Sequence, residues 1–176
     1  MNNINKDIEF VPINISVLTI SDTRNEEDDK SGKLLLKKIN ESKHNLIDKK
    51  IIKDDLLLIK KTIIEWSNKK NIDVIITTGG TGLTGRDSTP EALLEISDKI
   101  IDGFGELFRH ISFTKIGTSS IQSRALGCVV NGKYVFSLPG SPSACKDAWE
   151  EILKFQLDIR HKPCNFVEIL PRLKEK

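Results

Sequence analysis

A run of glycine and threonine in the middle of the chain has the composition of a site that binds an anion. The segment TTGGTGLTGRD, residues 77–87, holds four glycines and four threonines. Glycine lets a backbone approach a ligand closely and turn its N–H groups toward it, and threonine adds hydroxyl donors. So many glycines would cost an ordinary turn too much conformational entropy. A loop of this kind suits a phosphate group.

Two known phosphate-binding motifs overlap this segment, and neighbouring residues argue against both. The pattern G-x-G-x-x-G, residues 80–85, indicates dinucleotide binding when it follows the first strand of a fold and opens directly into a helix. Here it follows the third predicted strand, and the next helix begins only near Pro90. A Walker A loop needs Lys and then Ser or Thr after its last glycine, but Arg86 and Asp87 occupy those positions.

Asp87 places a negative charge beside this predicted phosphate site, and a cation between the two would relieve the repulsion. Mg²⁺ does this in nucleotide chemistry, where one or two carboxylates hold it together with phosphate oxygens. Asp54 is the second candidate, because it follows the second predicted strand and would lie at the same edge of a parallel sheet. Asp54 and its neighbour Asp55 also suit helix capping, so the residues alone leave both roles open.

The segments that would position these residues have the patterns of buried strands and amphipathic helices. Residues 13–20, 44–52 and 72–78 are rich in β-branched and apolar side chains, which indicates strands. A helix is expected after the first strand, with Ser31 as its N-cap, and residues 54–70 have helical spacing. A third helix begins near Pro90, where Ser88 and Glu91 can form a capping box.

The second half of the chain adds a hairpin and further helices. A helix is expected over residues 105–116, Asn131-Gly132 predicts a hairpin between two apolar runs, and Ser141 is the predicted cap of the last helix. The sequence after Pro163 reads as irregular. The order of elements predicts a three-layer α/β/α sandwich with a mostly parallel sheet and one antiparallel hairpin. We expect a single domain at 11–166, with short tails at 1–10 and 167–176.

Two more polar loops are predicted at the sheet edge that carries the glycine loop. Residues 21–32, SDTRNEEDDKSG, follow the first strand, and residues 137–144, SLPGSPSA, follow the last. The second of these leads into a helix N-terminus, which favours anions. A solvated loop and a plain capping turn are the simpler interpretations of the two segments. Together with the glycine loop and the segment at Asp54, they make four polar loops at one edge, which is nevertheless more than a fold requires.

The overall composition argues against several classes of function. A net charge of +2 gives no reason to predict binding to nucleic acid or to a membrane. No apolar run approaches the ~20 residues that span a bilayer, and the N-terminal sequence lacks the features of a signal peptide, so we expect a cytoplasmic protein. The three cysteines and three histidines are scattered, which argues against a zinc site or a disulfide framework.

Several segments together resemble the MoaB/Mog family of molybdenum cofactor biosynthesis. Residues 77–93, TTGGTGLTGRDSTPEAL, and 138–152, LPGSPSACKDAWEEI, are similar to its two signature segments. Residues 18–32 resemble its N-terminal loop, and residues 102–127 the segment between the signatures. Residues 160–166, RHKPCNF, resemble the MoaB branch in particular. The resemblance extends over about residues 11–166, and the combination is far more specific than any single glycine motif.

The resemblance implies a molybdopterin-binding fold and a nucleotidyl transfer. Active members of the family adenylylate molybdopterin: its phosphate attacks the α-phosphate of ATP, Mg²⁺ assists, and pyrophosphate leaves. Molybdopterin and ATP are therefore the implied partners, Mg²⁺ is the implied cofactor, and a homotrimer or a homohexamer (a dimer of trimers) is the implied assembly.

The resemblance also implies roles for individual residues. Asp54 and Asp87 match the catalytic, Mg²⁺-binding aspartates. The residues implied to bind the pterin phosphate or the nucleotide are Ser21, Asp22, Ser31, Gly32, Thr78, Gly79, Gly80, Thr81, Gly82, Pro139, Gly140, Ser141 and Ala144. Arg86, Arg124 and Lys146 are candidate charge partners, although a surface salt bridge also suits each of them.

One departure from the family pattern leaves an alternative open. The Mog branch has a Pro-Asp pair where this chain has Lys53-Asp54, and the adjacent Asp55 makes the alignment ambiguous by one residue. By the same resemblance, MoaB-type relatives can carry another residue at this aspartate position, and some members of the branch are not clearly required for the cofactor, as expected of binding proteins without turnover. The alternative function is therefore a non-catalytic molybdopterin-binding or carrier protein, which would bind molybdopterin without releasing pyrophosphate.

Overall fold

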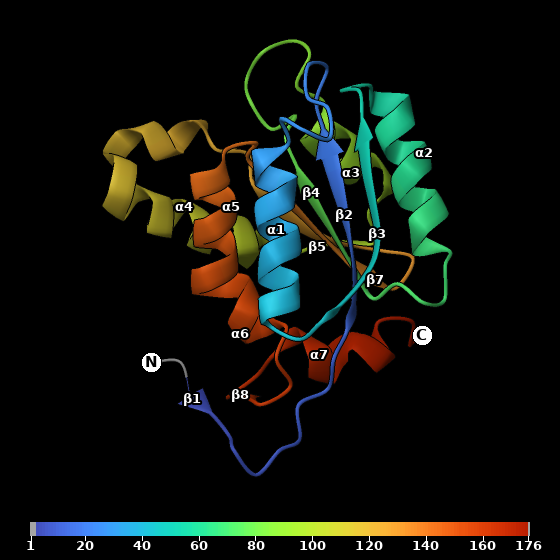
Figure 1. Ribbon diagram of the computed structural model, residues 1–176, viewed down its shortest axis with the longest axis vertical. Coiled ribbons are helices and arrows are strands. Elements are labelled where there is room, and N and C mark those ends of the chain that lie inside the picture. The colour runs from blue at the N-terminus through green and yellow to red at the C-terminus, as the bar shows by residue number, and fades with distance from the viewer. Residues whose placement is uncertain (1–2, 176) are drawn as a thin grey trace.

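The computed structural model describes residues 3–175 and shows a six-stranded sheet between two layers of helices (Figure 1). The strands are β1 (Asn3–Ile4), β2 (Asn14–Ile20), β3 (Asn45–Ile52), β4 (Val74–Thr78), β5 (Lys99–Ile100), β6 (Leu126–Val130), β7 (Lys133–Leu138) and β8 (His161–Lys162). The helices are α1 (Lys30–Glu41), α2 (Leu56–Ser67), α3 (Thr89–Ile96), α4 (Asp102–Ile116), α5 (Pro142–Ala148), α6 (Lys154–Gln156) and α7 (Phe166–Ile169). The 3-10 turns are η1 (Gly117–Gln122) and Leu170–Arg172, and Trp149–Leu153 is a π-helical turn between α5 and α6.

The sheet has the order β3-β2-β4-β7-β6-β5, and its first four strands are parallel. Strands β5 and β6 are antiparallel additions at the other edge. The predicted α/β/α fold class with a mostly parallel sheet is confirmed. Because β2, β3, β4 and β7 run in the same direction, the loops that follow them meet at one end of the sheet, the top of Figure 1.

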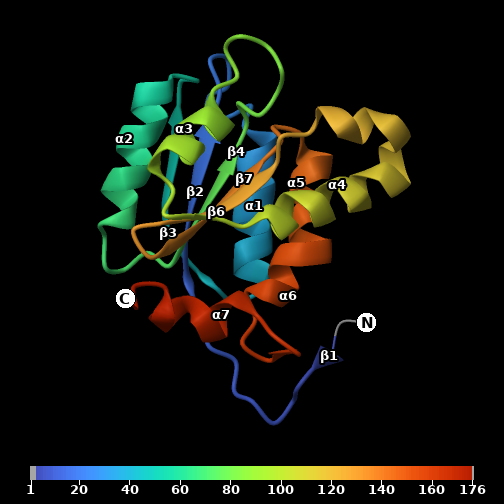
Figure 2. The same ribbon diagram turned by 180° about the vertical axis from the view of Figure 1, so that it is seen from behind.

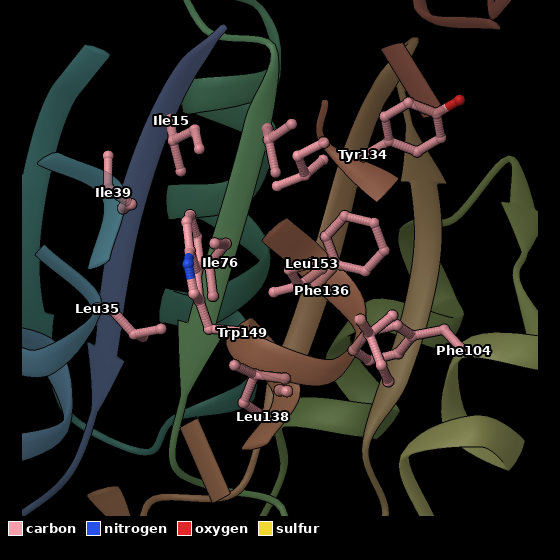
Figure 3. Close-up of a cluster of buried hydrophobic side chains, with 14 of the residues drawn as sticks. Ile15, Leu35, Ile39, Ile76, Phe104, Tyr134, Phe136, Leu138, Trp149 and Leu153 are labelled. Carbon is pink, nitrogen blue, oxygen red and sulfur yellow. The ribbon is translucent and has the colours of Figure 1, made fainter. Parts of the chain in front are cut away.

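Each face of the sheet buries its own hydrophobic core. Helices α1, α4 and α5 cover one face, and α2 and α3 cover the other (Figure 1, Figure 2). Trp149 and Phe136 are fully buried in the first core, which Figure 3 shows in close-up, and Trp66 is fully buried in the second. Alternate side chains of β2 and β4 point into opposite cores, so these central strands are apolar on both faces, as the sequence predicts.

The predicted hairpin and the predicted cap of the last helix are both present. Asn131 and Gly132 have positive φ angles of 49° and 69°, as a two-residue turn between β6 and β7 requires. The Ser141 side chain accepts a hydrogen bond from the backbone N–H of Ala144 at 3.3 Å, at the start of α5. These features are local in sequence, which is why composition alone predicts them.

Two helix starts differ from the prediction, because the serine expected to cap each helix donates its hydroxyl to a neighbouring segment. Ser31 donates to Gly140 O, and Ser88 donates to Asp54. The N-cap of α1 is Asp29 and not Ser31, and its carboxylate accepts hydrogen bonds from Gly32 N and Thr19 Oγ1, both at 2.9 Å. Ser88 is the N-cap of α3, but its hydroxyl donates to Asp54 and makes no capping bond. The expected capping box with Glu91 is therefore absent.

The segment after Pro163 is more regular than the sequence predicts. Helix α7 and a 3-10 turn form there, capped by Asn165, whose side chain accepts from the Glu168 backbone N–H at 2.9 Å. Phe166 packs against Tyr134 with ring centroids 4.8 Å apart, and β1 pairs with β8. This tertiary packing orders a segment that has no strong local signal. Residues 1–2 and 176 of the expected tails lie outside the described residues.

Within residues 3–175, none of the helices combines the length and apolar character needed to cross a membrane.

A buried histidine makes the stability of this fold sensitive to acid. His44 is 5% exposed, its Nδ1 accepts from Ile13 N at 3.3 Å, and burial lowers its pKa to about 4. The unfolded chain, with a histidine pKa near ~6.5, therefore takes up the proton first, and stability falls as pH drops from that value toward 4. We expect His44 to contribute a loss of about 2 kcal/mol in the free energy of unfolding between pH 7 and pH 5.

Urea unfolding at the two pH values measures this loss. His44→Gln should show a smaller difference by about that amount. The matched variant His110→Gln, at an exposed histidine, should keep the wild-type difference. An unchanged pH dependence in His44→Gln would show that other groups cause it.

Candidate functional site

A cleft of about 610 Å³ opens at the end of the sheet where the parallel strands finish. The four predicted polar loops and the inner side of α4 form its walls. Twelve of the predicted site residues line it: Ser21, Asp22, Asp54, Gly79, Gly80, Thr81, Gly82, Asp87, Pro139, Gly140, Ser141 and Ala144. The topology thus brings together residues that are more than one hundred positions apart in the sequence.

The glycine loop begins directly after β4, and at Gly79 and Gly80 its backbone runs too close to neighbouring atoms for a side chain. Gly79 has a φ of 106°, and a Cβ there would lie 2.1 Å from the carbonyl oxygen of Ile20. Gly80 has a φ of 63°, and its Cβ would lie 2.2 Å from Thr89 Oγ1. Thr89 closes the base of the loop, since its N–H donates to Gly80 O and its hydroxyl to Gly79 O, both at 3.0 Å. These glycines are therefore required by the path of the backbone.

Asp54 lies between the end of β3 and the start of α2, with its carboxylate against the N-terminus of α3. Its Oδ1 accepts from the backbone N–H of Ser88 at 3.1 Å and from the Ser88 hydroxyl at 2.8 Å. Burial raises the pKa of Asp54 above its ordinary value, and the bonds from Ser88 oppose that shift. The adjacent Asp55 instead caps α2 by accepting from Leu58 N at 2.7 Å, which separates the roles of the two aspartates.

Asp87 closes the far end of the glycine loop and holds the loop in a compact turn. Its Oδ2 accepts from the backbone N–H and the hydroxyl of Thr84, at 2.9 and 2.5 Å. The bond from the Thr84 hydroxyl lowers the pKa of Asp87 below its ordinary value, so this carboxylate is ionised at neutral pH. A Cβ at Gly82 would lie 2.7 Å from Oδ2, which shows how closely the loop surrounds the charge.

Asp54 and Asp87, the two predicted magnesium ligands, both line the cleft. Asp54 and Asp87 come from different loops, and each contributes to the electrostatics of the same cleft, since Asp87 is among the groups that raise the pKa of Asp54. Across residues 3–175 the His, Cys, Asp and Glu side chains form no cluster of three or more that could hold a metal alone. Mg²⁺ is commonly held by one or two carboxylates with substrate phosphates supplying further oxygens, so this donor set fits Mg²⁺ bound together with a phosphate ligand.

The loop after β7 forms the opposite wall and is tied to the loop after β2. Gly140 O accepts hydrogen bonds from Arg24 Nη2 at 2.6 Å and from Ser31 Oγ at 2.7 Å. Arg24 and Arg86 both line the cleft, and Arg86 lies 4.0 Å from Asp22. These guanidinium groups supply positive charge that a phosphate ligand needs. Arg124 and Lys146, the other candidate charge partners, do not line the cleft.

Three predicted ligand residues lie behind the cleft walls and not in them. Ser31 is fully buried and holds Gly140, as described above. Thr78 is also fully buried, and its hydroxyl donates to Pro139 O at 3.0 Å. Gly32 is buried under the carboxylate of Asp29. In this structure Ser31 and Thr78 bond to the backbone of the loop after β7, and Gly32 packs against the cap of α1.

The sequence analysis missed the wall that α4 and η1 contribute. Phe108, Ser112 and Ile116 line the cleft, followed by Gln122 and Ser123. The first three follow one another at intervals of four and so share one helix face. That spacing was the available signal, but the apolar residues of this helix equally suit an ordinary core. Phe108 is buried at 1% exposure, whereas Ile116 is 58% exposed and offers apolar surface at this wall.

Comparison with known protein families gives a match over most of the chain. Residues 16–159 match the family described as a probable molybdopterin binding domain. The "Molybdenum cofactor biosynthesis protein B" of Escherichia coli (strain K12) is 47% identical over 158 residues, which cover 90% of this chain and 93% of the relative. The protein of the same name from Bacillus cereus is 44% identical over 142 residues, covering 80% and 84%.

Solved structures give the same result for the fold. A crystal structure of a molybdenum cofactor biosynthesis protein B superposes with a TM-score of 0.85 at 40% identity, over 94% of this chain and 98% of that one. The tungsten cofactor synthesizing protein MoaB from Pyrococcus furiosus superposes with a TM-score of 0.77 at 34% identity, over 93% and 98%. A Mog protein from Mycobacterium ulcerans, at 21% identity and a TM-score of 0.76, shares the fold.

Proposed function

The chain belongs to the molybdopterin-binding domain family, and on that premise we propose that it acts in molybdenum cofactor biosynthesis as a molybdopterin adenylyltransferase. The observation that carries the proposal is the meeting of two carboxylates, Asp54 and Asp87, with the glycine loop in one cleft. A protein that only bound the pterin phosphate would gain nothing from two carboxylates beside that anion. A reaction between two phosphates, with a divalent cation between them, accounts for both.

The proposed reaction requires positioning more than proton transfer. An oxygen of the molybdopterin phosphate forms a bond to the α-phosphorus of ATP while the bond from that phosphorus to the β-phosphate oxygen breaks, and pyrophosphate leaves. A phosphate monoester is already an anion near pH 7, so the attacking oxygen needs no general base. The protein must therefore hold the two substrates in line and offset their negative charge.

The residues of the cleft divide this task between its walls. The backbone N–H groups of the glycine loop and the turn at Ser141 serve as donors to phosphate oxygens. The guanidinium groups of Arg24 and Arg86, which both line the cleft, offset the negative charge of the phosphates. Asp54 and Asp87 would hold Mg²⁺, which when bound neutralises charge on the reacting phosphates. The exposed side chain of Ile116 offers apolar surface for a ring system at the α4 wall.

Release of pyrophosphate from Mg-ATP, measured with and without molybdopterin, tests the proposed function. We expect release only when molybdopterin is present, and a fall to background when a chelator removes Mg²⁺, because two carboxylates and two phosphates then repel one another. Restoring Mg²⁺ should restore release. Molybdopterin binding without any release would instead establish the alternative, a binding or carrier protein of the same fold.

We also propose that the chain forms a homotrimer or a dimer of trimers through α4 and η1. Phe113 and Ile121 are 56% and 83% exposed there, together with Leu107 and Ile116, a concentration of large apolar side chains that favours an interface. Sedimentation should show an oligomer whose mass falls toward that of one chain in Phe113→Glu and Ile121→Glu. Leu57→Glu, at an exposed leucine on α2, is the matched control and should remain assembled. A monomeric wild-type protein would refute the assembly.

A further inference from the structure

Arg124 contacts the glycine loop from the side that faces away from the cleft. It lies between η1 and β6, and its guanidinium donates to two backbone carbonyls of the loop. Nε donates to Thr81 O at 3.3 Å, and Nη2 donates to Asp87 O at 3.0 Å. One rigid group thus joins the first and the last part of the loop that ends in Asp87.

Thr89 fixes the base of the loop at Gly79 and Gly80, but residues 81–87 have few other attachments. Asp87 and Thr84 bond to each other, so those bonds shape the loop without attaching it to the rest of the protein. Among residues 3–175, the hydrogen bonds that reach residues 81–87 from outside the loop come from Arg124. The ion pair of Arg86 with Asp22, at 4.0 Å on an exposed side chain, is a weak additional link.

Arg124 is itself fixed where it can act as a support. Its Nη1 forms an ion pair with Glu91 on α3, and its side chain is only 26% exposed. It lines a separate pocket of about 500 Å³ behind the loop, beside Arg109. Because Arg124 does not line the cleft, it is not placed to contact the substrates directly.

We propose that Arg124 is a positioning residue, which sets the distance between Thr81 and Asp87 and so holds the Asp87 carboxylate in the cleft. The expected effect of Arg124 on turnover rests on the proposed function, whereas its expected effect on the position of the loop is independent of that function. The planar guanidinium provides several donors in a fixed arrangement, whereas a lysine ammonium is a single flexible point of charge. Lysine at this position keeps the charge and cannot bridge both carbonyls in the same geometry.

Hydrogen exchange of the loop amides tests the positioning role without substrates. In Arg124→Lys we expect exchange of the Thr84 and Asp87 amides, which are hydrogen-bonded within the loop, to accelerate at least about 10-fold, with the rest of the chain unchanged, because residues 81–87 lose their bonds to Arg124. The matched control is Arg109→Lys, since Arg109 also donates to backbone carbonyls, those of Ser123 and Ala125, at 3.5 and 3.3 Å, but does not touch the loop. It should leave exchange in the loop within about 2-fold of wild type.

Glu91→Gln provides a milder variant, which keeps Arg124 and removes its ion-pair partner. It should give a smaller acceleration in the same residues. Unchanged loop exchange in Arg124→Lys, or an equal acceleration throughout the chain, would overturn the inference. The first result would mean that the loop holds itself, and the second that Arg124 serves general stability.

The kinetic constants kcat and KM provide a second test, because a purely structural role of Arg124 would not lower kcat alone. A misplaced Asp87 should lower kcat for pyrophosphate release by about 30-fold in Arg124→Lys, with the KM for ATP altered less than about 3-fold. A rise in KM with kcat unchanged would contradict the positioning role and indicate a substrate contact. If wild-type protein releases no pyrophosphate, the proposed function fails, while the exchange comparison still decides whether Arg124 holds the loop.

Discussion

Asp54→Asn and Asp87→Asn should each lower the rate of molybdopterin-dependent pyrophosphate release by about 10³-fold, which corresponds to ~4 kcal/mol of lost transition-state stabilisation. Asparagine keeps the size of each side chain and can still accept a hydrogen bond from Ser88 or Thr84. What it removes is the negative charge that holds a divalent cation between two phosphates. Higher Mg²⁺ concentrations should recover part of the lost rate in both variants, because the remaining carboxylate still binds the ion weakly.

Asp55→Asn is the matched control for this experiment. Asp55 is adjacent in sequence, but its carboxylate caps α2 and does not line the cleft. Asparagine caps a helix about as well as aspartate, so turnover and stability should both stay close to wild type. A large loss of turnover in Asp55→Asn, with Asp54→Asn unaffected, would show that the second carboxylate of the site had been assigned one residue too early.

Gly79→Ala should destabilise the protein by roughly 4 kcal/mol or more, a large part of the total stability of a domain of this size. The φ of 106° is one that alanine rarely adopts, and the added Cβ would lie 2.1 Å from the backbone oxygen of Ile20. Ile20 ends β2 and Gly79 directly follows β4, so neither backbone segment can move aside without breaking the central sheet. Urea unfolding at neutral pH, followed by far-UV circular dichroism, measures the change.

Gly85→Ala is the control within the same loop. A Cβ at Gly85 would have no heavy atom within 4 Å, so we expect a change in the free energy of unfolding of no more than ~0.5 kcal/mol. Equal stability of the two variants would contradict the close approach of Gly79 to β2. The pair also separates glycines that the fold requires from a glycine that only contributes to the composition of the motif.

Most of the fold could be predicted from the sequence because its elements have local signals. The buried strands β2 and β4 are continuous apolar runs, the turn at Asn131-Gly132 has the residues that positive φ angles need, and Ser141 with Pro142 marks the start of α5. The meeting of the four polar loops at one edge of the sheet followed from the prediction that the strands before them run parallel. The two-residue strands β1, β5 and β8 and helix α7 have no such signal, since packing against distant residues stabilises them.

For the candidate site, residue types indicated the chemistry, and distances decided which residues face it. Ser31, Gly32 and Thr78 have suitable types for binding a ligand, but each is buried against a neighbouring loop. Phe108, Ser112 and Arg24 line the cleft although their surroundings in the sequence resemble a helix core and a solvated acidic loop. The roles of individual residues in catalysis remain predictions for the experiments above.

By itself, the sequence determined the α/β/α architecture, the edge of the sheet that carries the site, and the glycine loop with its two candidate aspartates. Those properties depend on periodicity, turn chemistry and strand order, which are all local or nearly local. Only the tertiary structure decided that Asp54 faces the cleft while Asp55 caps α2, and that Arg124 supports the glycine loop from behind. Both outcomes depend on a few ångströms between segments more than thirty residues apart, such as the bonds of Ser88 to Asp54 and of Arg124 to Asp87, and no local pattern encodes such distances.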